Sequence, residues 1–222
     1  MTKLRTSAAG FTMIELLVSM VLSLVTVASV YAVYRVQAHT LNVQQNRQIA
    51  MDYARGVVDT MVREIRNAGA NPLGVSSGAN CAGSPTAGLP GVVTATSTSF
   101  KLTYDYRGSA AGSLPDGNCD DPDEEVTYQY QIPGPQNCAS GTGDITRTAN
   151  GTTEPLTDCN VTAFSLSYYA QNSSTAMSPV VVTDIQRVQL TVTVQSKHPD
   201  GQFGGQLTST ISSNIDLRNR GL

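Results

Sequence analysis

The chain contains one long apolar stretch at residues 10–34, with the sequence GFTMIELLVSMVLSLVTVASVYAVY. No charged residue follows Glu15 within this stretch, which makes it long enough to cross a bilayer as a helix of about 20 apolar residues. The short polar segment before it carries Lys3 and Arg5, which favours a cytoplasmic N-terminus. No small-residue cleavage site follows the apolar run, as one would in an ordinary secretory signal. We therefore expect a membrane helix that stays attached to the rest of the chain.

Glu15 is the unusual residue of this helix, because it places a carboxylate at the cytoplasmic end of an apolar run. An acidic side chain in the middle of a bilayer costs roughly 2.5 to 3.5 kcal/mol. Glu15 therefore needs either a partner or a position at the level of the lipid headgroups, where its side chain reaches water.

The order of residues around Glu15 resembles the class III signal of type IV prepilins and pseudopilins. Gly10, Phe11 and Thr12 are followed by two apolar residues, Glu15 and the membrane span. The resemblance implies that a prepilin peptidase cuts the bond between Gly10 and Phe11 and methylates the new N-terminus at Phe11. It also implies that Glu15 pairs with the N-terminal amine of a neighbouring subunit in a filament. A carboxylate and an ammonium in an apolar filament core would offset one another's loss of hydration.

The same helix is expected to continue well beyond the membrane. No proline occurs before Pro72, and Gly69 together with Pro72 supplies a stop signal. We expect a leader at residues 1–10, a membrane and filament-core helix at 11–36, and an amphipathic helix at 37–70. Apolar residues of the last segment recur at helical spacing and should pack on a following domain. They are Tyr53 or Ala54, Val57, Val58, Met61, Val62, Ile65, Ala68 and Gly69.

Residues 71–222 are predicted to form a β-rich domain outside the cytoplasm. Several segments alternate apolar and polar residues with the period of a strand, which predicts a sheet with one buried face. The apolar positions are Phe100, Leu102, Tyr104 and Tyr106; Val126, Tyr128, Tyr130 and Ile132; Phe164, Leu166 and Tyr168; Val188, Leu190, Val192 and Val194; and Leu207, Ile211 and Leu217. The fold class is therefore α+β, with a long N-terminal helix packed against an antiparallel sheet, in a type IV pilin-like arrangement.

All four cysteines lie in this second region, and none belongs to a Cys-x-x-Cys pair of the kind used by zinc or redox sites. Outside the cytoplasm they are expected to form two disulfides rather than buried thiols. Three connectivities remain open. The candidates are Cys81, Cys119, Cys138 and Cys159.

A weak calcium site is considered at an acidic loop, because its side chains offer oxygen ligands. The candidate ligands are Asp116, Asn118, Asp120 and Asp123. The loop lacks the glycine at the sixth position and the glutamate at the twelfth that an EF-hand requires. We prefer a solvated acidic loop, and no cofactor or other metal is expected. His39 and His198, the only histidines, are interpreted as surface residues.

The composition excludes several classes of function. The formal net charge is −3 and only 14% of residues are charged, so general nucleic-acid binding is not expected. No nucleophile, base and orienting group occur together, so an enzyme is not expected. Three segments resemble PilW-type minor pilins: Met61–Gly69, Asp123–Tyr128 and Leu217–Arg220.

The resemblance implies a minor pilin that takes part in type IV pilus assembly, in an initiation or tip complex. Its implied partners are prepilin peptidase, other pilin and minor pilin subunits, and an inner-membrane assembly platform. The protein would reside in the bacterial inner membrane and then in a filament. Two alternatives remain: a J-type pseudopilin of type II secretion, in a periplasmic pseudopilus, and a binding module at the pilus tip.

Overall fold

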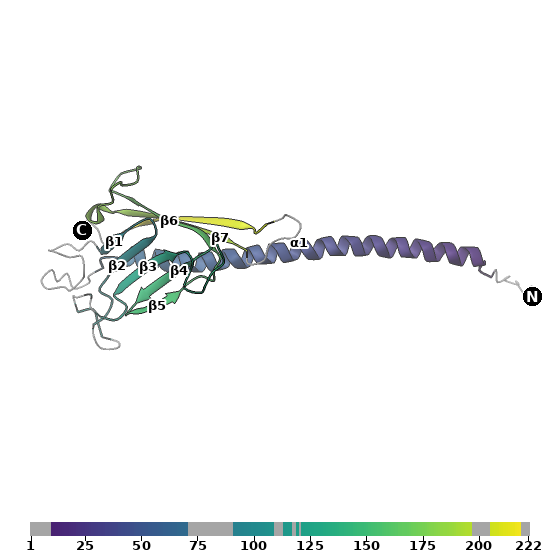
Figure 1. Cartoon of the computed structure of the whole chain (residues 1–222), viewed down its shortest axis with the longest axis horizontal. Helices are drawn as coiled ribbons and strands as arrows, with labels where there is room; N and C mark the ends of the chain where they lie inside the picture. The colour runs from purple at the N-terminus through teal and green to yellow at the C-terminus, as the bar shows by residue number, and fades with distance from the viewer. Residues whose placement is uncertain are drawn as a thin grey trace, which may run out of the picture. The chain divides into compact units, whose positions relative to one another are not determined.

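The structure, a computed structural model of the chain, describes residues 10–70, 91–108, 113–116, 119, 121–196 and 205–218. These residues form a long α-helix, two antiparallel sheets and a short 3-10 helix, η1 (Val182–Asp184) (Figure 1). Internal contacts divide the chain into two compact units, Met1–Gln45 and Asn46–Leu222. The fold class is α+β, as predicted, with a long apolar N-terminal helix and antiparallel sheets.

Helix α1 (Met13–Asn67) is 55 residues long and runs without interruption through both units. The absence of proline allows this length, since proline would remove a backbone donor and clash with the preceding turn. The helix ends where Gly69 adopts a left-handed conformation, with φ of 75°. This is the usual conformation of a glycine just beyond a helix C-terminus, and α1 ends at Asn67, three residues before the end expected at residue 70.

The last five turns of α1 bury one face in the hydrophobic core of the larger unit. The buried residues recur at helical spacing, as the sequence predicts. They are Ala50, Ala54, Val57, Val58, Met61 and Ile65. Of the two residues considered for the first turn of this stripe, Ala54 is fully buried, whereas Tyr53 is 52% exposed.

A five-stranded sheet packs on this face of α1 and has the order β1-β2-β3-β4-β5. Its strands are β1 (Val92–Ala95), β2 (Ser99–Thr103), β3 (Glu125–Gln131), β4 (Asp144–Ala149) and β5 (Thr152–Pro155). In β2 and β3 the buried side chains of Phe100, Leu102, Val126 and Tyr128 alternate with less buried ones, and Phe100 lies opposite Tyr128.

A three-stranded sheet, with the order β6-β7-β8, completes the core. Its strands are β6 (Val161–Tyr169), β7 (Arg187–Gln195) and β8 (Thr208–Asp216). The two sheets meet where Phe100 stacks on Tyr168, with ring centroids 5.9 Å apart. The Tyr168 hydroxyl also donates to the Thr96 carbonyl oxygen at 2.6 Å, which satisfies a polar group of an otherwise apolar contact.

The domain differs from its sequence prediction in the number of sheets and strands. The alternation predicts an antiparallel sheet with one buried face, and the described strands divide this structure into two antiparallel sheets. Strands β1, β4 and β5 were missed: β1 and β5 are short, and β4 has consecutive rather than alternating buried residues. The sequence did carry a signal for the β4–β5 hairpin, because Asn-Gly is typical of a two-residue hairpin turn. Asn150 and Gly151 form this turn, with φ of 50° and 70°.

Two expected apolar positions are also exposed. Tyr106 is 66% exposed and Ile132 is 56% exposed, because β2 ends at Thr103 and β3 ends at Gln131. Alternation beyond a strand end therefore carries no information about burial, since the pleat that directs the side chains has stopped.

Candidate functional site

The described part of the chain begins with three residues outside the helix, Gly10, Phe11 and Thr12. Thr12 caps α1: its Oγ1 atom accepts a hydrogen bond from the Glu15 backbone N–H at 3.3 Å, and its carbonyl oxygen accepts one from Leu16 at 3.2 Å. These bonds satisfy donors that the first helical turn leaves unpaired. Thr12 and Glu15 have the spacing of a capping box, a local signal that explains where the helix starts.

Glu15 lies in the first turn of α1, where the positive end of the helix dipole favours a carboxylate. Gly10 and Phe11 before the helix are both exposed, and Phe11 is 79% exposed. A side chain added at Gly10 would meet no atom within 4 Å. The peptide bond between Gly10 and Phe11 is therefore accessible and lies outside regular helical structure.

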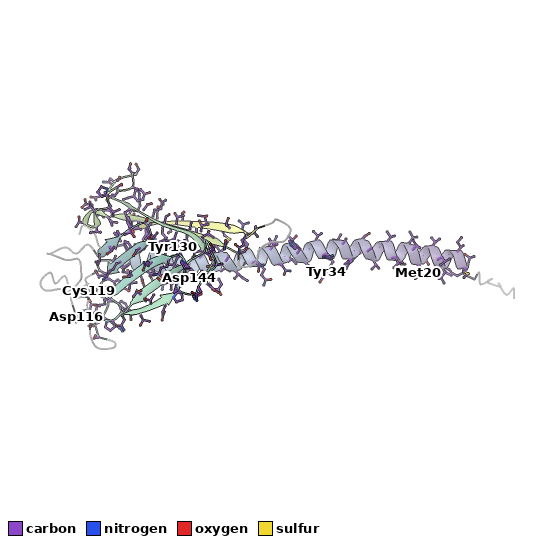
Figure 2. The ribbon with its side chains drawn as sticks, in the orientation of Figure 1. Met20, Tyr34, Asp116, Cys119, Tyr130 and Asp144 are labelled. Carbon is purple, nitrogen blue, oxygen red and sulfur yellow. A yellow bond between two sulfur atoms is a disulfide. The ribbon has the colours of Figure 1, made fainter. Side chains whose placement is uncertain are left out.

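The apolar side chains of the first half of α1 have no cover within the described structure. Figure 2 shows Met20 and Tyr34 pointing away from the helix, and they are 59% and 64% exposed. Every large apolar residue from Phe11 to Val36 is more than half exposed. By length and composition this helix can cross a membrane, and its most apolar part is not buried anywhere in the chain. Water is an unfavourable environment for such a surface, which requires lipid or other proteins.

The hydroxyl groups in this apolar segment are satisfied by the helix itself. Ser19, Ser23, Thr26 and Ser29 each donate to a backbone carbonyl oxygen three or four residues earlier, at 2.7 to 2.9 Å. A hydroxyl without a partner would be costly in hydrocarbon, whereas these hydroxyls already have acceptors. The polar residues of the segment are thus compatible with a lipid environment.

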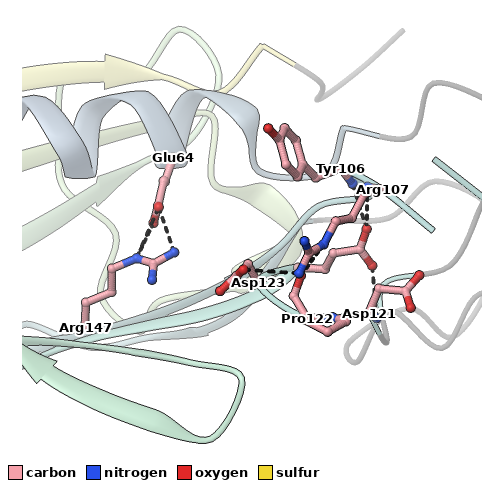
Figure 3. A network of polar contacts seen from close by, with 8 residues as sticks. Glu64, Tyr106, Arg107, Asp121, Pro122, Asp123 and Arg147 are labelled. Carbon is pink, nitrogen blue, oxygen red and sulfur yellow. Dashed lines mark hydrogen bonds and ion pairs between the residues drawn. The ribbon is translucent and has the colours of Figure 1, made fainter. Parts of the chain in front are cut away.

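A polar centre, formed by Glu64, Arg147 and Tyr128, lies between α1 and the five-stranded sheet. Glu64 forms an ion pair with Arg147 of β4, with Nη2 and Oε1 2.9 Å apart, and their side chains are only 16% and 22% exposed (Figure 3). The Tyr128 hydroxyl of β3 donates to the other carboxylate oxygen. Burial, and then the negative charge of Glu64, raises the pKa of Tyr128. The same two causes raise the pKa of Tyr104 to about 12. The centre connects helix to sheet.

Sequence reasoning missed this centre, although one signal was present. Glu64 lies three residues after Met61 and seven after Val57, which places it beside the buried stripe of α1. A charged residue at such a position needs a partner, because burial without one is costly. The partner, Arg147, is 83 residues away in sequence and could not be chosen from local pattern.

One carboxylate of the acidic loop, that of Glu124, binds backbone N–H groups of the chain itself. Glu124 is fully buried and accepts hydrogen bonds from the backbone N–H groups of Tyr106, Arg107 and Asp121 at 2.8 to 3.2 Å. Figure 3 shows this cluster together with Asp123, which pairs with Arg107 at 3.3 Å. The loop is therefore organised by its own backbone and by an arginine.

The four calcium candidates are only partly described. Asp123 is directed to Arg107, so one of its oxygens is already used in an ion pair. Asp116 is exposed, and Asn118 and Asp120 lie outside the described residues. Among the residues that the structure describes, one group has metal-ligand spacing: Cys138, Asp144 and Cys159.

That group does not offer free thiolates, because Cys138 and Cys159 are joined in a disulfide. Asp144 is fully buried beside it and accepts hydrogen bonds from the Cys159 backbone N–H at 2.6 Å and the Thr157 hydroxyl at 3.2 Å. Cys119 is disulfide-bonded as well. Cys81 lies outside the described residues, as does His198, whereas His39 is half-buried on α1.

The comparison with protein families agrees with the N-terminal geometry. Residues 5–31 match the prokaryotic N-terminal methylation motif, which supports a type IV pilin-like prepilin or pseudopilin and, with the apolar helix, membrane anchoring. Proteins with this motif are structural rather than enzymatic, and they assemble with other pilins. Searches among curated proteins and solved structures gave no match.

Proposed function

We propose that the chain is a minor pilin of the PilW type, which takes part in the initiation or tip complex of a type IV pilus. Residues 1–10 serve as the leader, and 11–36 anchor the protein in the bacterial inner membrane before they enter the filament. Residues 37–70 carry the domain formed by 71–222. The observation that supports this proposal best is the methylation motif at the start of a helix whose first half leaves all of its large apolar side chains uncovered.

The proposal gives the uncovered helix two successive environments. Lipid covers its apolar surface first, and other pilin helices cover it after assembly. The hydrophobic effect favours both states, because each of them removes the apolar surface from water. A prepilin peptidase and an inner-membrane assembly platform act between the two states.

Glu15 is proposed to pair with the N-terminal ammonium of a neighbouring subunit. Glu15 has no ionic partner within the described part of its own chain. It lies in the first turn of α1, at the N-terminal end of the helix. In an apolar filament core both charges would lose their hydration, and their mutual attraction would offset this desolvation penalty. The pairing also sets the axial position of one helix against the next.

The first test examines processing. Gly10→Val should block cleavage in cells that contain a prepilin peptidase, because a bulky side chain would stand at the scissile bond. Intact-mass and N-terminal peptide mass spectrometry should find a methylated Phe11 at the start of the unmodified chain and of a Ser7→Ala control. An unmodified chain that still begins with Met1 would refute the proposal.

The second test examines assembly. Glu15→Ala should leave processing intact and reduce recovery of the chain in sheared filaments at least tenfold, which quantitative immunoblotting can measure. Glu154→Ala, which removes an exposed carboxylate of β5, serves as the matched control and should assemble normally. Normal incorporation of Glu15→Ala would contradict the pairing role. Recovery of the unmodified chain only from periplasmic pseudopili would assign it to the J-type pseudopilins.

A further inference from the structure

The Cys138–Cys159 disulfide lies against the buried side chain of Asp144. It joins the loop between β3 and β4 to the loop between β5 and β6. Asp144 is the first residue of β4 and is fully buried. Its Oδ2 atom lies 3.1 Å from the Sγ atom of Cys138 and 3.7 Å from the Sγ atom of Cys159. One carboxylate oxygen is therefore in contact with both sulfur atoms.

The two oxygens of Asp144 have different surroundings. Oδ1 accepts hydrogen bonds from the Cys159 backbone N–H at 2.6 Å and from the Thr157 hydroxyl at 3.2 Å. No N–H or O–H group of the described residues donates to Oδ2, and the sulfur atoms of a disulfide carry no hydrogen. A buried carboxylate oxygen without a donor is unfavourable. A thiol at Cys138 would supply this donor, because its S–H group would lie within hydrogen-bond distance of Oδ2.

The backbone near the disulfide is adapted to this contact. Of the five described non-glycine residues with positive φ, four are Asn or Asp, which tolerate that conformation, and the fifth is Cys159, with φ of 49°. Gly134 is buried beside the contact, and a Cβ atom there would overlap both Asp144 Oδ2 and Cys138 Sγ. A side chain at Gly134 would therefore separate the carboxylate from the sulfur. Strained backbone of the kind seen at Cys159 is common at reactive sites.

We propose that Cys138 and Cys159 form a redox-active pair, in which Asp144 Oδ2 takes the proton of the Cys138 thiol when the disulfide closes. The co-reactant is an oxidant that itself carries a disulfide. Oδ2 lies nearer to Cys138 than to Cys159, and its distance from Cys138 Sγ is within the reach of a general base. The inference goes beyond the proposed function and does not depend on it.

Closure from the dithiol takes two exchange steps. The Cys159 thiolate first attacks a sulfur of the oxidant, which forms a mixed disulfide and releases one oxidant thiolate. Cys138 then gives its proton to Asp144 and attacks Cys159 Sγ as a thiolate, so the S–S bond of the chain forms and the second oxidant sulfur leaves as a thiolate. The chain has lost two electrons and two protons, and the oxidant has gained both as two thiols.

The first arm of the test uses the unmodified full chain in detergent. Dithiothreitol should open Cys138–Cys159 while the near-ultraviolet circular dichroism of the folded chain persists, because both cysteines are only half-buried and lie on loops. Alkylation followed by peptide mass spectrometry identifies the released thiols. Opening that occurs only together with unfolding would overturn the redox-active pair.

The second arm re-oxidises the reduced, folded chain with glutathione disulfide and measures the fraction of Cys159 held as a mixed disulfide. Attack by a thiolate slows about tenfold per pH unit below the ordinary cysteine pKa of about 8.5. The closing step should keep its rate, because Asp144 removes the Cys138 proton, so the fraction should fall by about tenfold or more from pH 8 to pH 6. Tyr130, whose pKa is raised by burial and then by the charge of Asp144, stays protonated in this range. A constant fraction would overturn Asp144 as the base.

The third arm removes the base. Asp144→Asn keeps the shape of the side chain but cannot accept the proton, so the mixed-disulfide fraction at pH 7 should rise by about tenfold or more and should be equal at pH 6 and pH 8. Glu124→Gln is the matched control, because it neutralises another fully buried carboxylate, whose hydrogen bonds go to backbone N–H groups outside both cysteine loops. It should behave like the unmodified chain. The same change in both variants would overturn the inference, and the first two arms decide it even if Asp144→Asn does not fold.

Discussion

Glu64 stands beside a row of buried apolar residues on α1 and is held there by Arg147 and Tyr128. Removal of one partner from a buried ion pair is far more costly than the pair's net contribution, because an unpaired charge stays behind. The pair therefore selects one rotation of α1 against the five-stranded sheet, since other rotations would bury Glu64 without a partner. It contributes to the specificity of the fold as well as to its stability.

The pair can be tested with a double-mutant cycle. Arg147→Met should destabilise the chain by about 3 kcal/mol, since it leaves the Glu64 carboxylate without its cation. Adding Glu64→Gln to this variant should recover a large part of the loss, because a neutral amide replaces the charge. Thermal unfolding in detergent, followed by near-ultraviolet circular dichroism, measures the free energies of unfolding. A double variant no more stable than Arg147→Met would contradict the account.

Tyr104, Tyr128 and Tyr168 make the folded state sensitive to alkali. Burial raises the pKa of each phenol above its unfolded value of about 10, and that of Tyr104 to about 12. A raised folded pKa gives stability that is complete below pH 10 and is lost as the pH rises through the folded pKa. Stability should therefore decrease between pH 10 and 12.

This loss can be followed by tyrosinate absorbance together with circular dichroism. Buried phenols should ionise together with unfolding, so the rise in tyrosinate absorbance should coincide with the loss of the circular dichroism signal. Tyr104→Phe should shift the unfolding midpoint to higher pH, because one group that favours the unfolded chain in alkali is gone. An unchanged midpoint would show that Tyr104 ionises without unfolding the chain.

At the scale of elements, the end of α1 is fixed to the sheet by close backbone contact. The Gly69 N–H donates to the Thr103 carbonyl oxygen at 2.9 Å, and the Thr103 N–H donates to the Gly91 carbonyl oxygen at 2.9 Å. A Cβ atom on Gly91 would lie 2.0 Å from the Gly69 nitrogen. Two backbone segments thus lie too close together to leave room for a side chain. This contact fixes the end of the helix against the sheet.

Gly91→Ala should destabilise the chain on the order of 3 kcal/mol or more, through left-handed strain and a backbone clash together. Gly151→Ala is the matched control. Its φ is also positive, at 70° against 57° for Gly91, but an added Cβ would meet no atom within 4 Å. It should cost only about 1 kcal/mol, from strain alone. Denaturant unfolding measures both, and equal losses would contradict a clash at Gly91.

At the scale of the whole molecule, the burial of α1 is divided sharply along its length. The first buried residue of the helix is Ala50, and none of the described residues before it is buried. The described core is drawn from residues at or beyond Ala50, so it belongs to Asn46–Leu222. The two units therefore depend on different environments, one on its own core and the other on an external apolar medium.

A chain that begins at Asn46 should fold without detergent. Its unfolding temperature should stay within a few degrees of that of the full chain, because the deletion removes no described core side chain. The full chain should require detergent or lipid to remain dispersed. Gel filtration and thermal unfolding of both chains provide the measurement. A truncated chain that aggregates or loses its near-ultraviolet signal would show that the first 45 residues contribute to folding.

Much of the architecture could be predicted because the responsible signals are local. The proline-free run before Pro72 predicts a long helix, and alternation predicts β7 with all four of its apolar positions buried. The β4–β5 hairpin was missed although Asn150 and Gly151 mark its turn, because the residues of β4 do not alternate. No local sequence signal indicated whether Tyr53 or Ala54 would face the core, because this depends on the rotation of α1 about its axis.

By itself, the sequence determined the length of the helix, its uncovered apolar half and the period of the main strands. These features follow from interactions within a few residues, such as the Thr12 cap and the spacing of apolar side chains. Only the tertiary structure decided that two sheets share the core, that Cys138 pairs with Cys159 and that Glu64 meets Arg147. Those choices depend on contacts between residues far apart in the chain, where many pairings satisfy the same local pattern and only packing distinguishes them.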